Sequence, residues 1–396
     1  MTKAVNQLVN FFVPEHYDLK LDIDRTKRSF HGKVIIKGHQ VADMILLHAH
    51  DLEIQSSLIV LQGGGSVECE VIKRDNDEIE LRPTKPISNK FDIVTLQLEF
   101  SGNIQDGSMH GLYPCRYELD GESRELLATQ FESHHAREVF PCVDEPAAKA
   151  TFDVTLTTET GVTVLGNMPV KNQHKEAGTL VTTFDRTPRM SSYLLAWVIG
   201  DLQRKTAKTN SGVEVNVWAT PAQSPESLDF ALGEAVQLIE FFDDYFETPY
   251  PLPKSDHVAL PDFSSGAMEN WGLITYREIA LLADPATTTV QNKQQVSQVI
   301  AHELSHQWFG NLVTMRWWDN LWLNESFAKL MEYYAVDVLH PTWGTWLEFA
   351  TFETIIALRR DAIDGVQPVQ VGVRHPDEIG ALFDPAIVYA KGARLM

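Results

Sequence analysis

The chain has 396 residues, 44% of them hydrophobic and 10% aromatic, which is enough for two or more domains with substantial cores. Its 33 basic and 54 acidic residues give a formal charge of −21, which argues against a nucleic-acid-binding or anionic-membrane surface, because both favour basic patches. Three widely spaced cysteines predict neither a disulfide framework nor a thiolate zinc site. Because the sequence shows no signal-peptide-like start and no run of about 18 apolar residues, we expect a cytoplasmic protein.

The first half of the chain alternates apolar and polar residues in short runs, as half-buried antiparallel strands do. Short strands separated by turn residues indicate a sandwich or an open, curved sheet. The run Gly63-Gly64-Gly65 is not followed by Lys-Ser or Lys-Thr, so it predicts a hairpin tip rather than a phosphate-binding loop. The predicted strands are 17–23, 34–37, 44–48, 58–61, 94–100, 151–157, 180–184 and 193–199.

Near residue 200 the pattern changes from strands to helices, and residues 205–212 are polar and rich in turn formers. We therefore expect an N-terminal β-domain in 1–203 and a mainly helical domain in 204–396. Ser224-Pro225 predicts a helix start, with serine as the cap and proline in the first turn, and this helix should end before Pro249. Two strands, 258–260 and 272–276, should bracket a loop at 261–271.

The sequence His302-Glu303-Leu304-Ser305-His306 predicts a metal site on a helix spanning about 295–309. Two histidines four residues apart share one helix face and can chelate one ion, and a hydrolytic zinc site needs a third protein ligand. Glu325, on a second helix predicted at 320–339, is the natural candidate, which leaves Glu303 free to act as a base. An isolated five-residue match is equally compatible with a purely structural helix, but the apolar face of this helix favours the functional interpretation.

Several motifs in order resemble the M1 family of zinc aminopeptidases, and its bacterial cytoplasmic members in particular. They are Thr-Gln-Phe-Glu at 129–132 leading into Phe-Pro-Cys-Val-Asp-Glu-Pro at 140–146, Gly-Ala-Met-Glu-Asn at 266–270, the zinc signature with its gap of eighteen residues, and Trp-Phe-Gly-Asn-Leu-Val-Thr at 308–314. The resemblance covers essentially the whole chain. It implies an α+β fold, with an N-terminal antiparallel β-sandwich or saddle followed by a thermolysin-like zinc peptidase domain.

The resemblance also implies roles for single residues. One Zn²⁺ per chain would be bound by His302, His306 and Glu325, with Glu303 as general base. Tyr389 matches the family tyrosine that stabilises the transition state, although a tyrosine in an apolar strand would otherwise be a packing residue. Glu132 and Glu269 would bind the substrate amino group, Gln130 and Met268 would line the first side-chain pocket, and the backbone of Gly266 and Ala267 would align the peptide; Asn270 completes the predicted substrate-binding set.

These groups fit the hydrolysis of an N-terminal peptide bond. Zinc can lower the pKa of bound water to about 7, and Glu303 could take the proton of that water and deliver it to the leaving amine. A terminal ammonium offers several donors and no acceptor, so paired carboxylates suit it, whereas an internal amide would leave them unpaired. The expected partners are peptides with a free N-terminus, with no nucleic acid and no membrane; the sequence does not predict an oligomeric state.

Two alternatives stay open at this point. Relatives of leukotriene A4 hydrolase, which combine epoxide hydrolase and peptidase activity, tend to carry Gly-Gly-Met-Glu-Asn, and Ala267 replaces the second glycine here. The other alternative is a fragment that binds peptide or metal without turnover. The chain stops at Met396, a few residues after Tyr389, whereas family members continue with further helices, so we expect the catalytic domain to be truncated at its C-terminal end.

Overall fold

A computed structural model describes residues 4–61, 65–86 and 93–396. The described residues form two compact units: a β unit of 4–114 and 126–200, and a helical unit of 115–125 and 201–396. The predicted domains, 1–203 and 204–396, are consecutive segments, whereas these units are interleaved at 115–125. Gly63 and Gly64 of the predicted hairpin tip lie outside the described residues.

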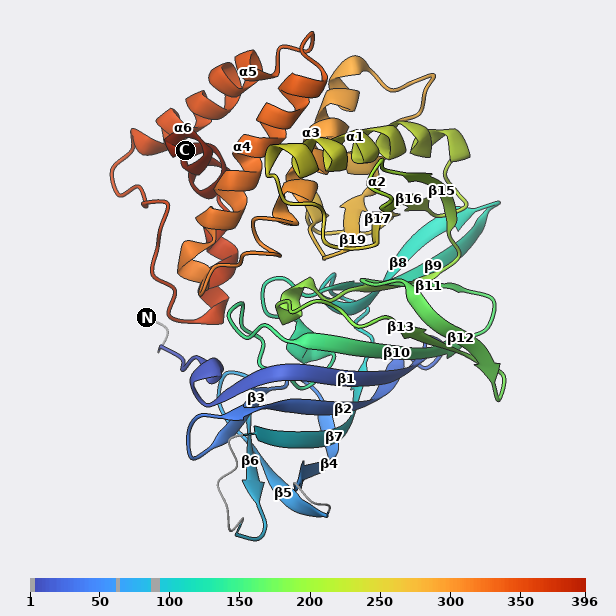
Figure 1. The fold of residues 1–396 in the computed structure, drawn as a ribbon, viewed down its shortest axis with the longest axis vertical. Coiled ribbons are helices and arrows are strands. Elements are labelled where there is room, and N and C mark those ends of the chain that lie inside the picture. The colour runs from blue at the N-terminus through green and yellow to red at the C-terminus, as the bar shows by residue number, and fades with distance from the viewer. Residues whose placement is uncertain (1–3, 62–64, 87–92) are drawn as a thin grey trace. The chain divides into compact units, whose positions relative to one another are not determined.

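The β unit is built on a ten-stranded sheet in the order β12-β13-β10-β1-β2-β7-β4-β5-β6-β3 (Figure 1). The paired strands are antiparallel except for β1 and β10, which run parallel, since the chain reaches β10 through a long crossover. The antiparallel β-domain predicted from the sequence is thus confirmed, apart from the parallel pair of β1 and β10. The strands are β1 (Phe12–Asp24), β2 (Ser29–Gln40), β3 (Ile45–His48), β4 (Glu53–Val60), β5 (Ser66–Lys73), β6 (Glu78–Pro83), β7 (Ile93–Asn103), β10 (Thr151–Glu159), β12 (Val170–Glu176) and β13 (Thr179–Phe184).

Alternation of buried and exposed side chains along β1 and β7 produces the core of the β unit. At its centre the rings of Tyr17 and Phe152 stack with centroids 4.9 Å apart. A second sheet has the order β11-β14-β9-β8. Its strands are β8 (Gly111–Leu119), β9 (Glu122–Gln130), β11 (Thr163–Gly166) and β14 (Trp197–Gly200).

The predicted strand 193–199 is wrong in its first half, because Ser192–Leu194 forms a 3-10 turn. The side chain of Asn167 replaces strand pairing there: its amide donates to the Leu194 carbonyl at 2.7 Å, and its oxygen accepts the Ala196 N–H at 2.8 Å. A local side chain that satisfies the backbone in this way competes with a sheet ladder.

The helical unit contains its own sheet, in the order β15-β16-β17-β19-β18. Residues 205–212 do not form only turns as predicted, because β15 covers part of them and pairs with β16. Its polar side chains fit a strand at the edge of the sheet, where Lys205 reaches Asp229 at 2.6 Å. The strands are β15 (Gln203–Lys208), β16 (Glu214–Ala219), β17 (Lys254–Leu260), β18 (Ala267–Met268) and β19 (Leu273–Arg277).

Three long helices pack beside this sheet, and α3 lies against both α1 and α4. Glu234 of α1 contacts both other helices. It accepts a hydrogen bond from Ser297 of α3 and lies 2.9 Å from His340 at the end of α4. The helix predicted at 295–309 begins earlier, after a Thr289 cap, and ends at His306. The helices are α1 (Asp229–Tyr245), α2 (Glu278–Leu281), α3 (Val290–His306), α4 (Trp322–Leu339), α5 (Thr345–Glu348), α6 (Thr354–Asp361) and α7 (Gly392–Leu395).

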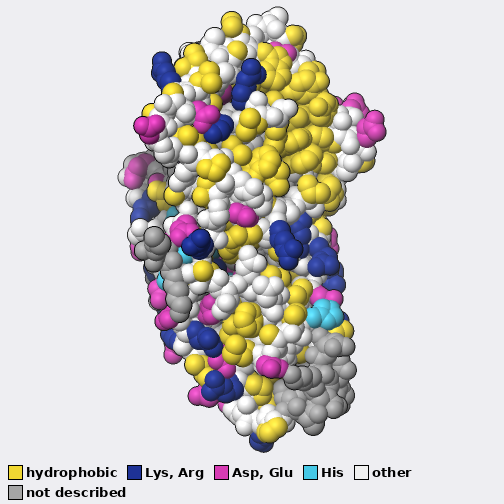
Figure 2. All heavy atoms as spheres, turned by 90° about the vertical axis from the view of Figure 1, so that its left-hand side faces the viewer, with side chains coloured by type: hydrophobic (Ala, Val, Ile, Leu, Met, Phe, Trp, Pro, Cys, Tyr) yellow, Lys and Arg dark blue, Asp and Glu magenta, His cyan; other side chains and the backbone are white. Residues whose placement is uncertain are grey.

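The sequence also predicts a helix over about 343–360, and this region forms α5 and α6, joined by a π-helical stretch at Phe349–Glu353. Figure 2 shows the left-hand side of Figure 1, where α5 and α6 lie. Apolar side chains gather in the upper half of this view. None of the described helices is long and apolar enough to cross a membrane. Exposed apolar residues of this helical stretch are Trp346, Leu347, Phe352, Ile355 and Leu358.

Candidate metal centre

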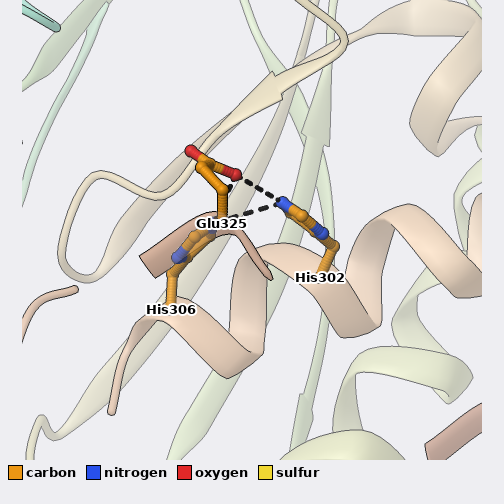
Figure 3. A group of neighbouring side chains, drawn as sticks. All are labelled: His302, His306 and Glu325. Atoms are coloured by element: carbon orange, nitrogen blue, oxygen red, sulfur yellow. Dashed lines mark hydrogen bonds and ion pairs between the residues drawn. The ribbon is translucent and has the colours of Figure 1, made fainter. Parts of the chain in front are cut away.

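Helices α3 and α4 bring His302, His306 and Glu325 together (Figure 3). The histidines are one turn apart on the buried face at the end of α3, and Glu325 lies in the first turn of α4. The Glu325 Oε2 atom is 3.2 Å from His302 Nε2 and 3.4 Å from His306 Nε2. The two Nε2 atoms are 3.1 Å apart. Residues predicted to share an ion are therefore neighbours in space.

These separations fit a tetrahedral zinc site. Ligand bonds of about 2.0–2.1 Å place the donor atoms of a tetrahedral ion about 3.3 Å apart. The three separations of 3.1, 3.2 and 3.4 Å bracket that value. Two imidazole nitrogens and one carboxylate oxygen are also the donor types of a hydrolytic zinc site, which keeps its fourth position for water.

The remaining imidazole nitrogens fix the orientation of both rings. His302 Nδ1 lies 2.8 Å from Glu332 Oε2, and His306 Nδ1 lies 3.1 Å from the Phe309 carbonyl oxygen. Both neighbours only accept hydrogen bonds, so the ring protons belong on Nδ1 and each Nε2 presents a lone pair to the common centre.

Charges around this centre favour a bound cation. Burial alone lowers the pKa of His302, but hydrogen bonds to Glu325 and Glu332 raise it to about 9. Burial raises the pKa of Glu325, yet His306 and His302 hold it well below its usual range. The cluster therefore stabilises positive charge between these side chains, and a divalent metal ion is the occupant that this arrangement would bind best.

Glu303 and Glu269 form a second group with His306, with donor atoms of all three within 4.8 Å of one another. Burial raises the pKa of Glu303 to about 8, against the effect of the two histidines. Burial also raises the pKa of Glu269. Glu269 is only 3% exposed, and its Oε1 atom has no hydrogen-bond partner among the described residues. A buried, unpartnered carboxylate oxygen indicates a place for a donor from a ligand.

The loop that carries Glu269 is held at several points. Met268 is buried, and Ala267 and Met268 form β18, which pairs on one side with β19 and is the last strand of its sheet. The Gly266 carbonyl accepts the Arg277 N–H at 2.9 Å, and the Asn270 side chain donates to Thr275 Oγ1 at 3.2 Å.

Tyr389 lies in a π-helical stretch, Pro385–Lys391, and not in an apolar strand as expected. Asp384 caps this stretch by accepting the Ala386 N–H at 2.8 Å, a local bond that favours a helical start. The Tyr389 ring is half-buried, and its centroid lies 6.0 Å from that of His302. The phenol therefore belongs to the surroundings of the metal cluster.

Gln130 and Glu132 belong to the β unit, where Gln130 is the buried last residue of β9 and Glu132 follows two residues later. The metal cluster belongs to the helical unit, so the roles predicted for Gln130 and Glu132 stay predictions.

The sequence alone did not indicate four further residues around the centre, three of them buried and one, Lys329, half-buried. Glu332 lies seven residues after Glu325, two turns along one helix face, and this spacing could have indicated a second carboxylate near the histidines. Lys329 lies between Glu332 and Glu353, 2.8 Å from each. Gln307 and Asn311 donate to the Glu269 carbonyl at 3.1 and 2.8 Å, and no sequence signal indicates this contact.

Comparisons with known proteins agree with these motifs. Residues 13–194 match the peptidase M1 N-terminal domain, and residues 230–396 match the peptidase family M1 domain. Aminopeptidase N of Lactococcus lactis subsp. lactis is 52% identical over 401 residues, covering 100% of this chain and 46% of the relative. Aminopeptidase N of Lactobacillus helveticus is 46% identical over 395 residues, covering 99% and 45%. The puromycin-sensitive aminopeptidase of Caenorhabditis elegans is 40% identical, covering 97% and 41%. The chain thus spans less than half the length of these relatives.

Proposed function

The chain belongs to peptidase family M1, and on this basis we propose that it provides the catalytic centre of a zinc aminopeptidase that removes N-terminal residues from peptides. The observation that carries the proposal is the position of Glu269. Its buried, unpartnered Oε1 lies beside a cluster of two histidines and a carboxylate that has zinc-like spacing. A cation-binding carboxylate next to a hydrolytic metal site distinguishes the end of a peptide from its interior.

Each side chain has a distinct part in this function. His302, His306 and Glu325 would hold one zinc ion, which when bound supplies a Lewis acid and lowers the pKa of water to about 7. Glu303 accepts a proton from the attacking water and returns it to the leaving amine. The Tyr389 phenol donates a hydrogen bond to the oxyanion of the tetrahedral intermediate.

Substrate recognition in this proposal uses the loop before β19. The Glu269 carboxylate accepts the α-ammonium group, together with Glu132 as the resemblance implies. The main chain of Gly266 and Ala267 would align the peptide, and the resemblance implies that Met268 and Gln130 line the pocket for the first side chain. An acetylated N-terminus has no charge and cannot satisfy the buried Glu269 carboxylate, so acetylated peptides should be rejected.

The test compares an unblocked aminoacyl-anilide with its N-acetylated counterpart on the zinc-loaded chain. We expect chelator-sensitive release of the anilide from the unblocked substrate alone. Glu303→Gln should retain zinc, measured by elemental analysis, and lower kcat by about 10²-fold or more, because general base catalysis contributes that much. Glu247→Gln removes an exposed carboxylate at the end of α1 and is the matched control. Equal turnover of both substrates would refute the exopeptidase assignment, and a folded, zinc-bound chain without turnover would favour a binding fragment.

A further inference from the structure

The main-chain carbonyl of Glu269 is held by two side-chain amides from the segment that directly follows α3. Gln307 Nε2 donates to this oxygen at 3.1 Å, and Asn311 Nδ2 donates to it at 2.8 Å. Both residues are fully buried. A carbonyl oxygen has two lone pairs, so these two donors saturate it and restrict the movement of the peptide unit that follows Glu269.

The donors are rigidly connected to a metal-binding residue. Gln307 directly follows His306, and its amide also donates to the Glu303 carbonyl at 3.0 Å. The Asn311 N–H donates to the His306 carbonyl at 3.0 Å. One short segment therefore carries a histidine of the metal cluster and both amides that hold the Glu269 carbonyl.

The orientation of the Gln307 side chain has an energetic cost. Both of its bonds are made by the NH₂ group, and its Oε1 atom is buried without a hydrogen-bond partner among the described residues. An unsatisfied buried acceptor typically costs about 1–3 kcal/mol. The side chain nevertheless keeps its donors on the two carbonyls, which indicates that holding Glu269 against α3 matters more than satisfying Oε1.

The chemistry of an aminopeptidase needs such a fixed distance. In the first residue of a peptide, the amino nitrogen and the carbonyl carbon are joined through one Cα atom, which keeps them about 2.5 Å apart. Because this spacing cannot stretch, the carboxylate that binds the amine must keep a constant distance from the metal cluster. A displacement of about 1 Å can lower the rate by about 10²-fold.

We propose that Gln307 and Asn311 are positioning residues that set the distance between Glu269 and the metal cluster, an inference that rests on the proposed aminopeptidase function. They contact neither substrate nor metal in this role. Removing either amide leaves the metal ligands in place but lets the Glu269 peptide unit move, so selectivity for a free amine falls while zinc is retained.

The test uses Gln307→Met and Asn311→Ala in the zinc-loaded chain, with Gln294→Met as the control. Gln294 lies on the same helix and also donates through its amide, but to Glu348 at 2.8 Å near the other end. We expect each test variant to raise KM for the aminoacyl-anilide about 10-fold with a smaller change in kcat. Binding of an α-amino hydroxamate, measured by calorimetry, should weaken by a similar factor, while binding of its N-acetylated form stays constant.

The outcomes separate this inference from the proposed function. Equal binding of the two hydroxamates by the unmodified chain would overturn the proposed function and the positioning role with it. Discrimination that persists unchanged in both folded variants would overturn the positioning role alone, as would loss of zinc in parallel with selectivity, since that indicates general support of α3. If Gln307→Met does not fold, Asn311→Ala decides the question, because it leaves Gln307 in place.

Discussion

The imidazole of His302 is held between two carboxylates that have different tasks. Glu325 faces Nε2 and the metal position, whereas Glu332 faces Nδ1 and orients the ring. Burial raises the pKa of Glu332, but Lys329 and His302 hold it below its usual range. Lys329 also contacts Glu353 at 2.8 Å, and Glu353 accepts the Tyr333 hydroxyl at 3.0 Å. A chain of alternating charge thus leads from the cluster to the π-helical stretch that precedes α6.

Removing Glu332 should weaken zinc binding without removing a ligand. A carboxylate on the outer nitrogen of a ligating histidine fixes its tautomer and raises its basicity, and loss of such a partner costs about 10- to 100-fold in metal affinity. We therefore expect Glu332→Ala to raise the Kd for zinc by that factor, measured by competition with a chromogenic chelator. The Kd of Glu332→Gln for zinc should lie between those of the unmodified chain and of Glu332→Ala, because the glutamine oxygen can still accept the hydrogen bond from His302 Nδ1.

Lys293→Met is the control for altered charge, since Lys293 lies on α3 over the Phe230 ring, away from the cluster. An unchanged zinc Kd in Glu332→Ala would contradict a role for this carboxylate in metal binding.

Local sequence spacing could predict part of this site but not all of it. His302, Glu303 and His306 lie on one helix, so helical geometry alone groups them, and Glu325 follows once a second helix is assumed. Gln307 and Asn311 act on a carbonyl 38 and 42 residues away in the chain. Such contacts depend on how a loop packs against α3, which no local pattern encodes.

At the scale of elements, the sequence predicted helices where α1, α3 and α4 lie, although α3 begins earlier than expected. The π-helical stretches at 349–353 and 385–391 were not predicted, because a single extra residue per turn leaves no clear mark on an apolar pattern. The second stretch carries Tyr389, which we propose to stabilise the oxyanion. Its position depends on the contact between Ser326 of α4 and Gly392.

Ser326 and Gly392 pack so closely that a side chain at 392 has no room. A Cβ atom there would meet Ser326 Oγ and would lie 2.6 Å from Ser326 Cβ. Ser326 Oγ also donates to the Val388 carbonyl at 2.5 Å, next to Tyr389. We expect Gly392→Ala to lower the free energy of unfolding by about 1–3 kcal/mol, the usual effect of overpacking, and to lower kcat by displacing Tyr389.

Gly233→Ala is the matched control, because Gly233 is exposed on α1 and a Cβ atom there meets nothing within 4 Å. That change should stabilise the chain by about 0.4–1 kcal/mol. Adding Ser326→Gly to Gly392→Ala should recover part of the lost stability. Denaturant unfolding of the unmodified chain, the two single variants at 326 and 392 and the double variant measures the coupling. Strictly additive effects would mean that the two residues do not interact.

At the scale of the whole molecule, the sequence predicted a β-rich half and a helical half, because alternation and helical periodicity each dominate one part of the chain. It did not predict the strands β15 and β16 or the grouping of 115–125 with the helical unit. The chain has a formal charge of −21, and one of its acids, the buried Glu145, should make the free energy of unfolding depend on pH.

Glu145 holds the N-terminal turn of the β unit by accepting the N–H groups of Leu8 and Val9. Burial raises its pKa to about 7 despite these bonds. The folded chain therefore binds this proton more tightly than the unfolded chain, whose glutamates titrate near 4.5. The contribution of Glu145 to the free energy of unfolding should be largest below about pH 4.5 and should fall as pH rises from 4.5 to 7.

The free energy of unfolding should fall by about 3 kcal/mol in all as Glu145 loses its proton, since a pKa difference of one corresponds to about 1.4 kcal/mol. Glu145→Gln should remove this pH dependence, because glutamine can still accept a hydrogen bond but does not titrate. Denaturant unfolding between pH 4.5 and 8 would then give a flatter profile for Glu145→Gln than for the unmodified chain. Glu176→Gln, which removes an exposed carboxylate from the same unit, should keep the original slope. Parallel profiles for Glu145→Gln and the unmodified chain would mean that Glu145 ionises as easily in the folded as in the unfolded state.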